Sequence, residues 1–276
     1  MRRGRLNLAV VAMAGAIAAP PSFSAGDAAE CPSAGTAPLS VASAVDGATL
    51  RLADGSEVRL AGVEAPMRPL DLPAGAPWPI ADEARERLAA LVGGGDTSAA
   101  WVAAGPDRYG RRHAYVFAGG VPVAQALLEE GLARAREYPD ESACFGPFLA
   151  AEAPALVAGR GLWALSQFRP VSADDSSLAE KNGLYALVEG RIDSVGHGTR
   201  MTFLDFGRDF RRDFTVMVPQ ELAVELAGAG LDPASLTGKR VRVRGVLEQS
   251  GGPAIVLDDA AALVVIDKAN DTGAGK

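Results

Sequence analysis

The feature that most constrains the fold is the alternation of side chains in residues 45–66, which read VDGATLRLADGSEVRLAGVEAP. Apolar and polar residues alternate from Thr49 to Leu52, and the alternation resumes at Val58 after the Asp54-Gly55 pair. A period of two is typical of a strand, and Asp-Gly between two such runs is typical of a tight turn. The segment therefore predicts a β-hairpin with arginines on one face.

A second stretch, residues 107–115, reads DRYGRRHAY. Together the two stretches resemble the thermonuclease, or staphylococcal-nuclease-like, family, which has a DGDT turn, a (D)xPE segment, a DxYGRxLAY segment and a helix ending near GLW. The resemblance covers residues 41–163. It implies a five-stranded barrel of the oligonucleotide-binding type, capped by helices, and Ca²⁺-dependent hydrolysis of phosphodiester bonds in DNA or RNA.

The residue pattern of the first region, residues 38–167, predicts the same mainly β, α+β architecture. One helix begins with Pro122 and ends at Gly131, as proline in the first turn and glycine after the last turn favour. Expected strands lie near residues 39–45, 48–53, 56–64, 98–103 and 112–118, and expected helices near 80–92, 121–131 and 147–159.

Residues 168–182 are polar and without periodicity, which predicts a linker. Beyond it, residues 183–267 predict three strands, a helix and two strands, an order that suggests a second, smaller OB-like β-barrel. The expected strands lie near 184–195, 199–206, 212–218, 239–248 and 253–266, the helix near 219–229, and a flexible tail at 268–276.

The first 25 residues are typical of a cleaved export signal. Arg2, Arg3 and Arg5 precede an apolar run at residues 6–19, and small residues follow. The run is shorter than a membrane-spanning helix requires, so we expect no span after cleavage. Residues 26–37 have the composition of a linker. The sequence therefore predicts an extracytoplasmic protein, periplasmic or secreted.

The length and the net charge of the chain limit the functions that it can have. A chain of 276 residues with 48% apolar composition is long enough for two domains with separate cores. Its formal net charge is −7, and loss of the signal's three arginines makes it more negative. Acidity argues against tight, sequence-blind binding of long duplexes, which depends on neutralising many phosphates. A local basic cleft remains compatible with it.

The chain has two cysteines, Cys31 and Cys144. In an exported protein we favour a disulfide between them, and two free thiols are the alternative. No cysteine and histidine cluster has the spacing of a zinc site, since His113 and His197 stand alone. His113 is expected on the surface of a strand.

By the resemblance, Arg59 and Arg111 correspond to the two arginines of the family that stabilise the negative charge of the transition state. Guanidinium groups suit this role because their parallel N–H donors match two phosphate oxygens. The alternative is that both are ordinary surface charges.

The metal and base positions depart from the family pattern. The second aspartate of DGDT is Ala48, the next expected aspartate is Glu64, and the glutamate after the proline is Met67, which cannot accept a proton. Asp46 and Glu64 would then form a weak, incomplete calcium site. Glu64 is the candidate substitute base, and Asp71 is a second candidate. For Asp46, the alternative is an Asp-Gly turn without chemistry.

Tyr109 and Tyr115 match family positions near the nucleotide, where a ring can stack on a base or bond a phosphate. The alternative is that they are tyrosines at the edge of the core. Trp163 is expected to pack against the barrel.

In the second region, arginines alternate with valines from Arg240 to Arg244, and others crowd a predicted hairpin loop at residues 208–212. A basic stripe of this kind can follow a phosphate backbone. Because no aromatic residues interleave it, we favour a solvated strand face balanced by Asp205, Asp209 and Asp213.

Two hypotheses for function follow. The first is an exported phosphodiesterase of the thermonuclease family with weakened or lost catalysis and weakly held calcium. The second is a non-catalytic module that binds a nucleotide, single-stranded nucleic acid or another anion, or that mediates protein contacts in the envelope.

Overall fold

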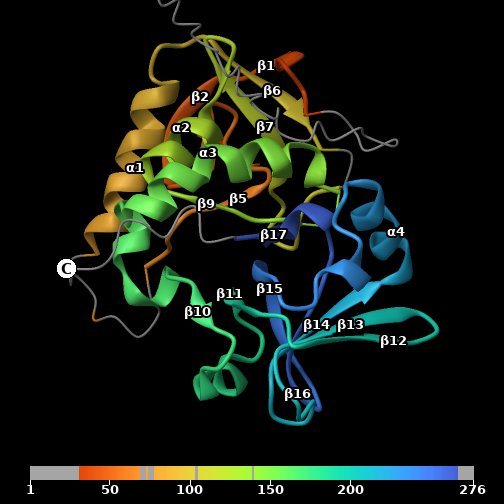
Figure 1. The fold of residues 1–276 in the computed structure, drawn as a ribbon. Coiled ribbons are helices and arrows are strands. Elements are labelled where there is room, and N and C mark those ends of the chain that lie inside the picture. Colours follow the sequence, from red (N-terminus) through yellow and green to blue (C-terminus); the bar gives the residue numbers. More distant parts are fainter. Residues whose placement is uncertain (1–30, 69–72, 74–77, 103–104, 139, 267–276) are drawn as a thin grey trace, which may run out of the picture.

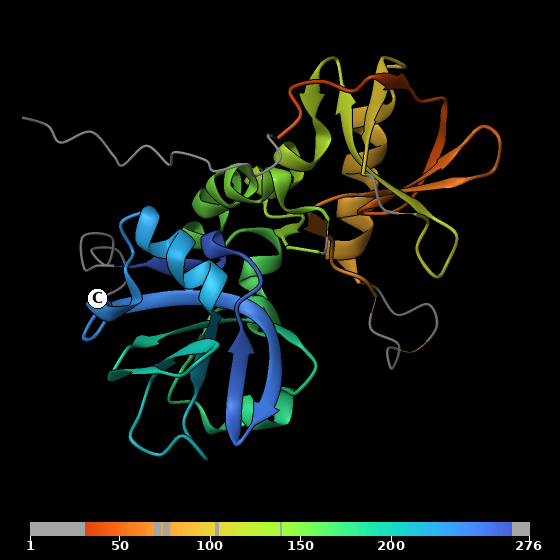
Figure 2. The same ribbon diagram turned by 90° about the vertical axis from the view of Figure 1, so that its right-hand side faces the viewer.

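The computed structural model describes residues 31–68, 73, 78–102, 105–138 and 140–266. The predicted signal at residues 1–25, Asp71 and the predicted tail at 268–276 lie outside the described residues. Figures 1 and 2 show two β-rich parts, the first drawn from red to green and the second from green to blue.

The first sheet, within the described residues, has seven strands in the order β1-β6-β7-β4-β3-β2, with β8 paired to β7. β4 and β7 run parallel, and the other neighbours are antiparallel. The strands are β1 (Ala37–Pro38), β2 (Val41–Asp46), β3 (Thr49–Leu52), β4 (Glu57–Leu60), β6 (Thr97–Trp101), β7 (Arg112–Ala118) and β8 (Val121–Pro122).

The hairpin of β3 and β4 forms because its apolar side chains share one face. Leu50 and Val58 are Cα partners and are buried, whereas Arg51 and Glu57 lie opposite each other and form an exposed ion pair. The strand pairings of this sheet form an open path with β1 and β2 at its ends. The structure therefore shows an α+β architecture. The closure of the sheet into a five-stranded barrel stays a prediction.

Three helices accompany the first sheet: α1 (Pro79–Val92), α2 (Val123–Glu130) and α3 (Phe145–Ala158). α2 ends because Gly131 adopts a left-handed conformation (φ 74°) and donates its N–H to carbonyls of the last turn. A side chain at Gly131 would also meet the backbone of Arg160. A separate short pair, β5 (Val63–Glu64) and β9 (Arg134–Ala135), lies beside α3.

The second sheet, again within the described residues, has eight strands in the order β10-β11-β15-β16-β14-β13-β12, with β17 paired to β15. Helix α4 (Gln220–Gly228) lies beside it. The strands are β10 (Val171–Ser172), β11 (Tyr185–Arg191), β12 (Ser194–His197), β13 (Met201–Asp205), β14 (Thr215–Pro219), β15 (Arg240–Ser250), β16 (Gly252–Val256) and β17 (Leu263–Val265).

The segment predicted as a linker contributes to this second sheet. Val171 pairs with Val188, a 3₁₀ turn follows at Ser176–Lys181, and Leu178 is buried in that turn. A closed second barrel is not shown, because these pairings also form an open path.

A buried ion pair joins the two parts. Arg244 on β15 is 5% exposed, and its guanidinium lies 2.6 Å from Glu152 on α3, which has no exposed surface. Arg244 also donates to the carbonyl of Ala135, and the N–H of Ala135 donates to Glu152. The interpretation of the arginine stripe as a solvated face is therefore wrong at Arg244, whose guanidinium is buried in the contact between the two β-rich parts.

The rest of the stripe is balanced by a different acid from those expected. Arg240 and Arg242 both pair with Glu189 on the neighbouring strand β11, at 3.2 and 2.6 Å, rather than with the predicted aspartates. Their partner lies opposite because β11 and β15 are antiparallel with Glu189 in register with Arg242. Glu189 therefore offsets part of the positive charge of the stripe within the sheet.

A disulfide joins Cys31 to Cys144, across a sequence separation of 113 residues. Cys144 is buried directly before α3, so the bond attaches the N-terminal end of the described chain to this helix. In the part of the chain that the structure describes, the helical stretch Ser142–Ala164 has the length and composition of a membrane span, a test that core helices also pass. Its residues Phe145, Phe148 and Ala155 are buried in the hydrophobic core.

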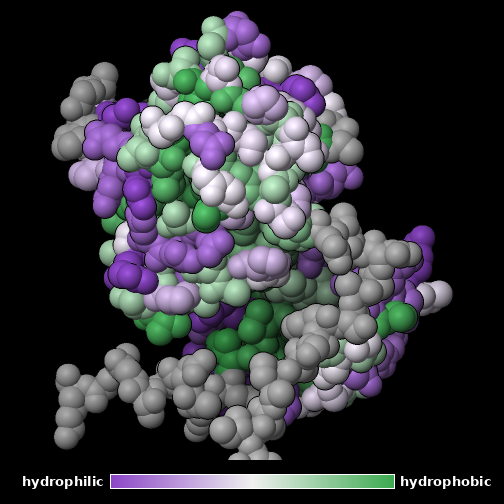
Figure 3. Space-filling view, turned by 90° about the horizontal axis from the view of Figure 1, so that it is seen from above, coloured by the Kyte–Doolittle hydropathy of each residue, from purple (hydrophilic) through white to green (hydrophobic). Residues whose placement is uncertain are grey.

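The molecular surface seen from above mixes hydrophilic and hydrophobic residues, with one larger hydrophobic patch and smaller hydrophobic areas elsewhere (Figure 3).

Candidate functional site

Arg59 and Arg111 lie at neighbouring strands of the first sheet. Arg59 is on β4, and Arg111 immediately precedes β7, which pairs with β4 in parallel so that Arg59 is the Cα partner of His113. Residues two apart on a strand share a face, so Arg59, His113 and Arg111 face the same side of the sheet. The hairpin and the DRYGRRHAY stretch are thus brought together as the sequence predicts.

Arg59 is a buried cation with little compensation. It is 9% exposed, and its guanidinium donates to the hydroxyl of Thr49 over a long 3.4 Å. Thr49 is its cross-strand partner on β3 and is also buried. Within the described residues no carboxylate forms an ion pair with Arg59. A buried guanidinium without a counter-charge is a strong attractor for an anion.

Arg111 has a carboxylate partner, Asp107. Its Nε and Nη2 lie 2.9 and 2.8 Å from Asp107 Oδ2, and the backbone N–H groups of Tyr109 and Arg111 donate to Oδ1. Burial raises the pKa of Asp107, but these hydrogen bonds and one from His113 outweigh it and hold the pKa far below its usual value. The aspartate therefore fixes the turn and orients Arg111.

Glu64, the candidate metal ligand and base, is held by two arginines. Arg134 lies 2.6 Å from Oε2, and Arg136 lies 2.9 Å from Oε1. Burial raises the pKa of Glu64, but the charges of the two arginines outweigh it and hold the pKa below its usual value. A carboxylate whose two oxygens are both bound to guanidinium groups is a poor proton acceptor and a poor metal ligand.

The second sheet supports these two arginines. Tyr185 on β11 lies with its ring 4.8 Å from each guanidinium carbon of Arg134 and Arg136, and its carbonyl accepts from Arg134. Its hydroxyl donates to Glu137, whose pKa is raised by burial. Sequence reasoning missed this contact, because no local pattern relates Tyr185 to β9.

The other expected metal residues are unsuited to calcium. Asp46 accepts the N–H of Ala48 at 2.7 Å, as a turn residue does, which favours the alternative given for it. Ala48 is fully buried, and Met67 is 65% exposed. Among the described residues, no group of three or more His, Cys, Asp or Glu side chains could hold a metal. Calcium takes six to eight oxygens, so the residues present do not fit it.

The two tyrosines have different environments. Tyr109 is 66% exposed, and the guanidinium carbons of Arg108 and Arg111 lie 4.8 Å from its ring centroid. Tyr115 is buried, donates its hydroxyl to the carbonyl of Glu141 at 2.7 Å, and has a pKa raised by burial to about 12. Tyr115 therefore lies at the core, which was the alternative to a position near the nucleotide. Tyr109 instead exposes its ring to solvent.

His113 lies on β7, on a strand as expected, and belongs to a polar cluster. Its side chain is 20% exposed, Nδ1 contacts Glu141, and Nε2 lies 3.4 Å from Asp107. Glu141 is buried and accepts the N–H of Gly62 at 2.8 Å. The pattern of the strand did not predict the cluster, because Glu141 comes from a loop that is distant in sequence. A histidine at the leucine position of the family motif was the only signal.

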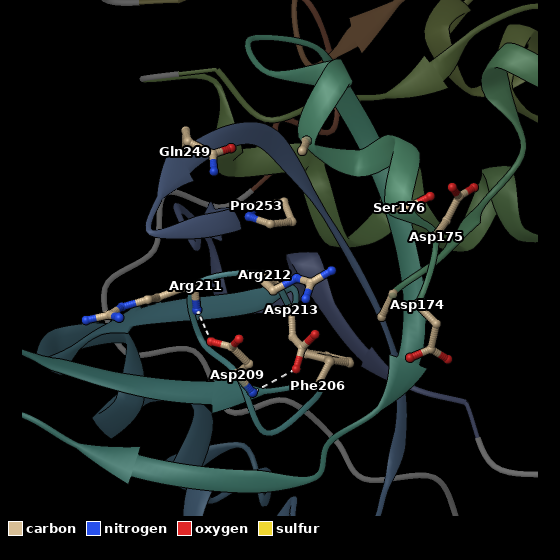
Figure 4. Close-up of a pocket in the computed structure, with 12 residues that line it drawn as sticks. Asp174, Asp175, Ser176, Phe206, Asp209, Arg211, Arg212, Asp213, Gln249 and Pro253 are labelled. Carbon is tan, nitrogen blue, oxygen red and sulfur yellow. Dashed lines mark hydrogen bonds between the residues drawn. The ribbon is translucent and has the colours of Figure 1, made fainter.

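A pocket of about 550 Å³ lies in the second part, away from these residues. Figure 4 shows the segment Asp174–Ser176 on one side and the loop before β14 on the other. The carboxylates of Asp209 and Asp213 accept backbone N–H groups of their own loop. They stabilise the loop conformation, and no buried polar group lies free to recognise a ligand among the lining residues described.

One family comparison decides how the first part is classified. Residues 57–165 match the family model described as staphylococcal nuclease homologue. This chain carries a staphylococcal-nuclease-like domain. The match begins on β4 and ends after α3, so it includes Arg59, Glu64 and the Asp107–Tyr115 segment. No curated protein matches the chain.

Proposed function

We propose that this staphylococcal-nuclease-like protein is exported and binds phosphodiesters at Arg59 and Arg111, with metal-dependent hydrolysis weakened or lost. The observation that carries this proposal is the pairing of both Glu64 oxygens with Arg134 and Arg136. It occupies one of the two carboxylates expected at the metal position, and the other, Asp46, accepts a backbone N–H in its turn, whereas Arg59 and Arg111 are retained at the motif positions.

The loss of catalysis follows from the chemistry of the substituted positions. Removal of a general base typically slows hydrolysis by about 10²- to 10⁴-fold, and Met67 supplies no base. Glu64 with its two arginines has a net positive charge, which repels a divalent cation. No step through calcium is therefore assigned to this site.

The retained binding function rests on Arg59 and Tyr109. Arg59 is buried without an ion pair in the described part of the chain, and a phosphate would supply the missing charge. Tyr109 exposes a ring beside two guanidinium groups, an arrangement that suits stacking of a base. This favours a nucleotide or single-stranded nucleic acid as the ligand of a module that need not be an enzyme.

A fluorescent single-stranded oligonucleotide tests binding and cleavage together. Anisotropy measures binding, and gel electrophoresis measures cleavage, each with calcium, with manganese and with chelator. We expect binding that persists in chelator and little cleavage. Arg59→Ala should weaken binding by about 10- to 100-fold, the worth of a hydrogen bond to a charged group. Arg51→Ala removes an exposed arginine of the same hairpin and should have little effect.

Two outcomes would overturn the proposal. Strong metal-dependent cleavage that Arg59→Ala abolishes would establish a working nuclease with a rebuilt site. Absence of binding by the folded wild-type protein would instead favour a scaffold that mediates protein contacts.

Export is supported by the Cys31–Cys144 disulfide, because such bonds persist in oxidising compartments. N-terminal sequencing of protein recovered from the periplasm or medium of an expressing bacterium tests it. We expect a mature chain that begins shortly after residue 25, whereas full-length protein in the cytoplasmic fraction would contradict export.

A further inference from the structure

The loop that joins β13 to β14 presents an aromatic ring among basic side chains. Its residues 207–213 read GRDFRRD. Phe210 is 62% exposed, and Arg208, Arg211 and Arg212 are exposed as well. The guanidinium carbon of Arg211 lies 5.5 Å from the centroid of the Phe210 ring. The loop therefore offers solvent one ring that can stack and several cations beside it.

The two carboxylates of the loop are bound to its own backbone. Asp213 accepts the N–H of Asp209 at 2.8 Å, and Asp209 accepts the N–H of Arg211 at 3.1 Å. A side chain at Gly207 would meet the carboxylate of Asp213, so only glycine permits this close approach. Neither aspartate of this described loop forms an ion pair with one of its arginines. The carboxylates therefore hold the shape of the loop rather than neutralise its cations.

The loop is also attached to the sheet around it. At its base, Phe206 donates its N–H to the carbonyl of Phe214 at 3.1 Å, and the two rings lie 5.1 Å apart. At its tip, the carbonyl of Phe210 accepts the N–H of Gly252 on β16 at 3.1 Å. The exposed side chains thus project from a backbone that is fixed before any ligand binds. Such preorganisation reduces the conformational entropy that binding costs.

The arginines of the loop have little compensation for their charge. In the part of the chain that the structure describes, Arg211 and Arg212 form no ion pair. The side chain of Arg208 is 96% exposed, and its Nε lies 3.9 Å from Asp193, a distance at which an exposed pair contributes little. Figure 4 shows the side chain of Arg211 pointing away from the other labelled residues. These guanidinium groups are therefore open to an anion that approaches from solvent.

We propose that this loop is a second binding surface for single-stranded nucleic acid, in which Phe210 stacks on an unpaired base and Arg208 and Arg211 donate to the neighbouring phosphates. The surface belongs to the second β-rich part and does not require the site at Arg59 and Arg111, so it goes beyond the proposed function. A single strand fits better than a duplex, whose bases are already stacked. It also fits better than a membrane, because the loop exposes one large apolar side chain and anchoring needs a larger apolar face.

The test is the dissociation constant of a fluorescent single-stranded oligonucleotide of about 16 nucleotides, a length that one binding module can cover, with chelator present. Phe210→Ala should weaken binding about 5- to 150-fold, the effect of losing one base–aromatic stack, and Phe210→Trp should keep it tight. Val224→Ala on α4 removes another exposed apolar side chain of the second part and is the matched control. Because these side chains are exposed, the variants should fold as the wild type does.

The salt dependence of binding tests the arginines. Arg208→Gln and Arg211→Gln together should reduce the slope of the logarithm of affinity against the logarithm of salt concentration. The expected reduction is about 1.4, because each phosphate contact to a single strand contributes about 0.7. An unchanged slope would contradict the assigned phosphate contacts.

The same measurements in the Arg59→Ala protein separate this inference from the proposed function. We expect Phe210→Ala to weaken binding in both backgrounds. If only Arg59→Ala weakens binding, the proposed function stands and the inference falls, whereas the reverse result keeps the loop and refutes the site at Arg59. Absence of binding by the wild type would overturn both. Phe210-dependent sedimentation with vesicles of phosphatidylglycerol and phosphatidylcholine, without oligonucleotide binding, would assign the loop to a membrane and overturn the inference.

Discussion

The buried ion pair between the two β-rich parts gives a sharp prediction for Arg244→Ala. The substitution leaves Glu152 without a counter-charge at a site with no exposed surface, although the N–H of Ala135 still donates to it. Breaking a buried pair by removing one partner costs about 3–5 kcal/mol. We expect the free energy of unfolding to fall by this amount.

Urea denaturation followed by two signals measures the effect. All three tryptophans, Trp78, Trp101 and Trp163, belong to the first part, so their fluorescence reports its unfolding, while far-UV circular dichroism reports both parts. Because Glu152 lies on α3, Arg244→Ala should lower the midpoint of the fluorescence signal although the substitution is in the second sheet.

Arg240→Ala on the same strand is the matched control. Arg240 pairs with Glu189 at the surface, and exposed pairs contribute about 0–1 kcal/mol. The reasoning would be refuted if Arg244→Ala cost no more than this control, or if it left the tryptophan transition unchanged.

Two further predictions concern the disulfide and Glu64. Replacing both Cys31 and Cys144 by serine should lower the free energy of unfolding by about 2–5 kcal/mol, because the bond closes a long loop; equal melting temperatures with and without reductant would contradict this. Because the ion pairs lower the folded-state pKa of Glu64 below its ordinary value of 4.5, its stabilising contribution is present above that value and is lost as the pH falls through the folded pKa. Stability should therefore decline more steeply in acid for the wild type than for Glu64→Gln, and parallel pH profiles in denaturant titrations would argue against the ion pairs with Arg134 and Arg136.

Local sequence patterns predicted most of the secondary structure. The Asp54-Gly55 hairpin, the helix that ends at Gly131 and the helix at 219–229 all depend on interactions between residues close in sequence. The short strands β1 and β9 were not predicted, because two-residue strands carry no periodicity and are stabilised by a partner far along the chain. For the same reason β10 was assigned to a linker.

The candidate site was predicted in its residue types more than in its contacts. Arg59 and Arg111 occupy motif positions, and the absence of carboxylates at Ala48 and Met67 can be seen without a structure. The ion pairs of Glu64 could not be predicted, because Arg134 on β9 and Arg136 just after it are distant in sequence and contact Tyr185 of the second sheet.

The sequence alone predicted the staphylococcal-nuclease-like domain, and it showed arginines at two motif positions and the lack of carboxylates at Ala48 and Met67, because motifs and alternation are local properties. Only the tertiary structure decided the environments of those groups. It left Arg59 buried without an ion pair in the described chain, paired Glu64 with two arginines, and enclosed His113 between Asp107 and Glu141. The protonation and binding capacity of a side chain depend on burial and on charges brought close by folding, and these partners lie on strands and loops distant in sequence.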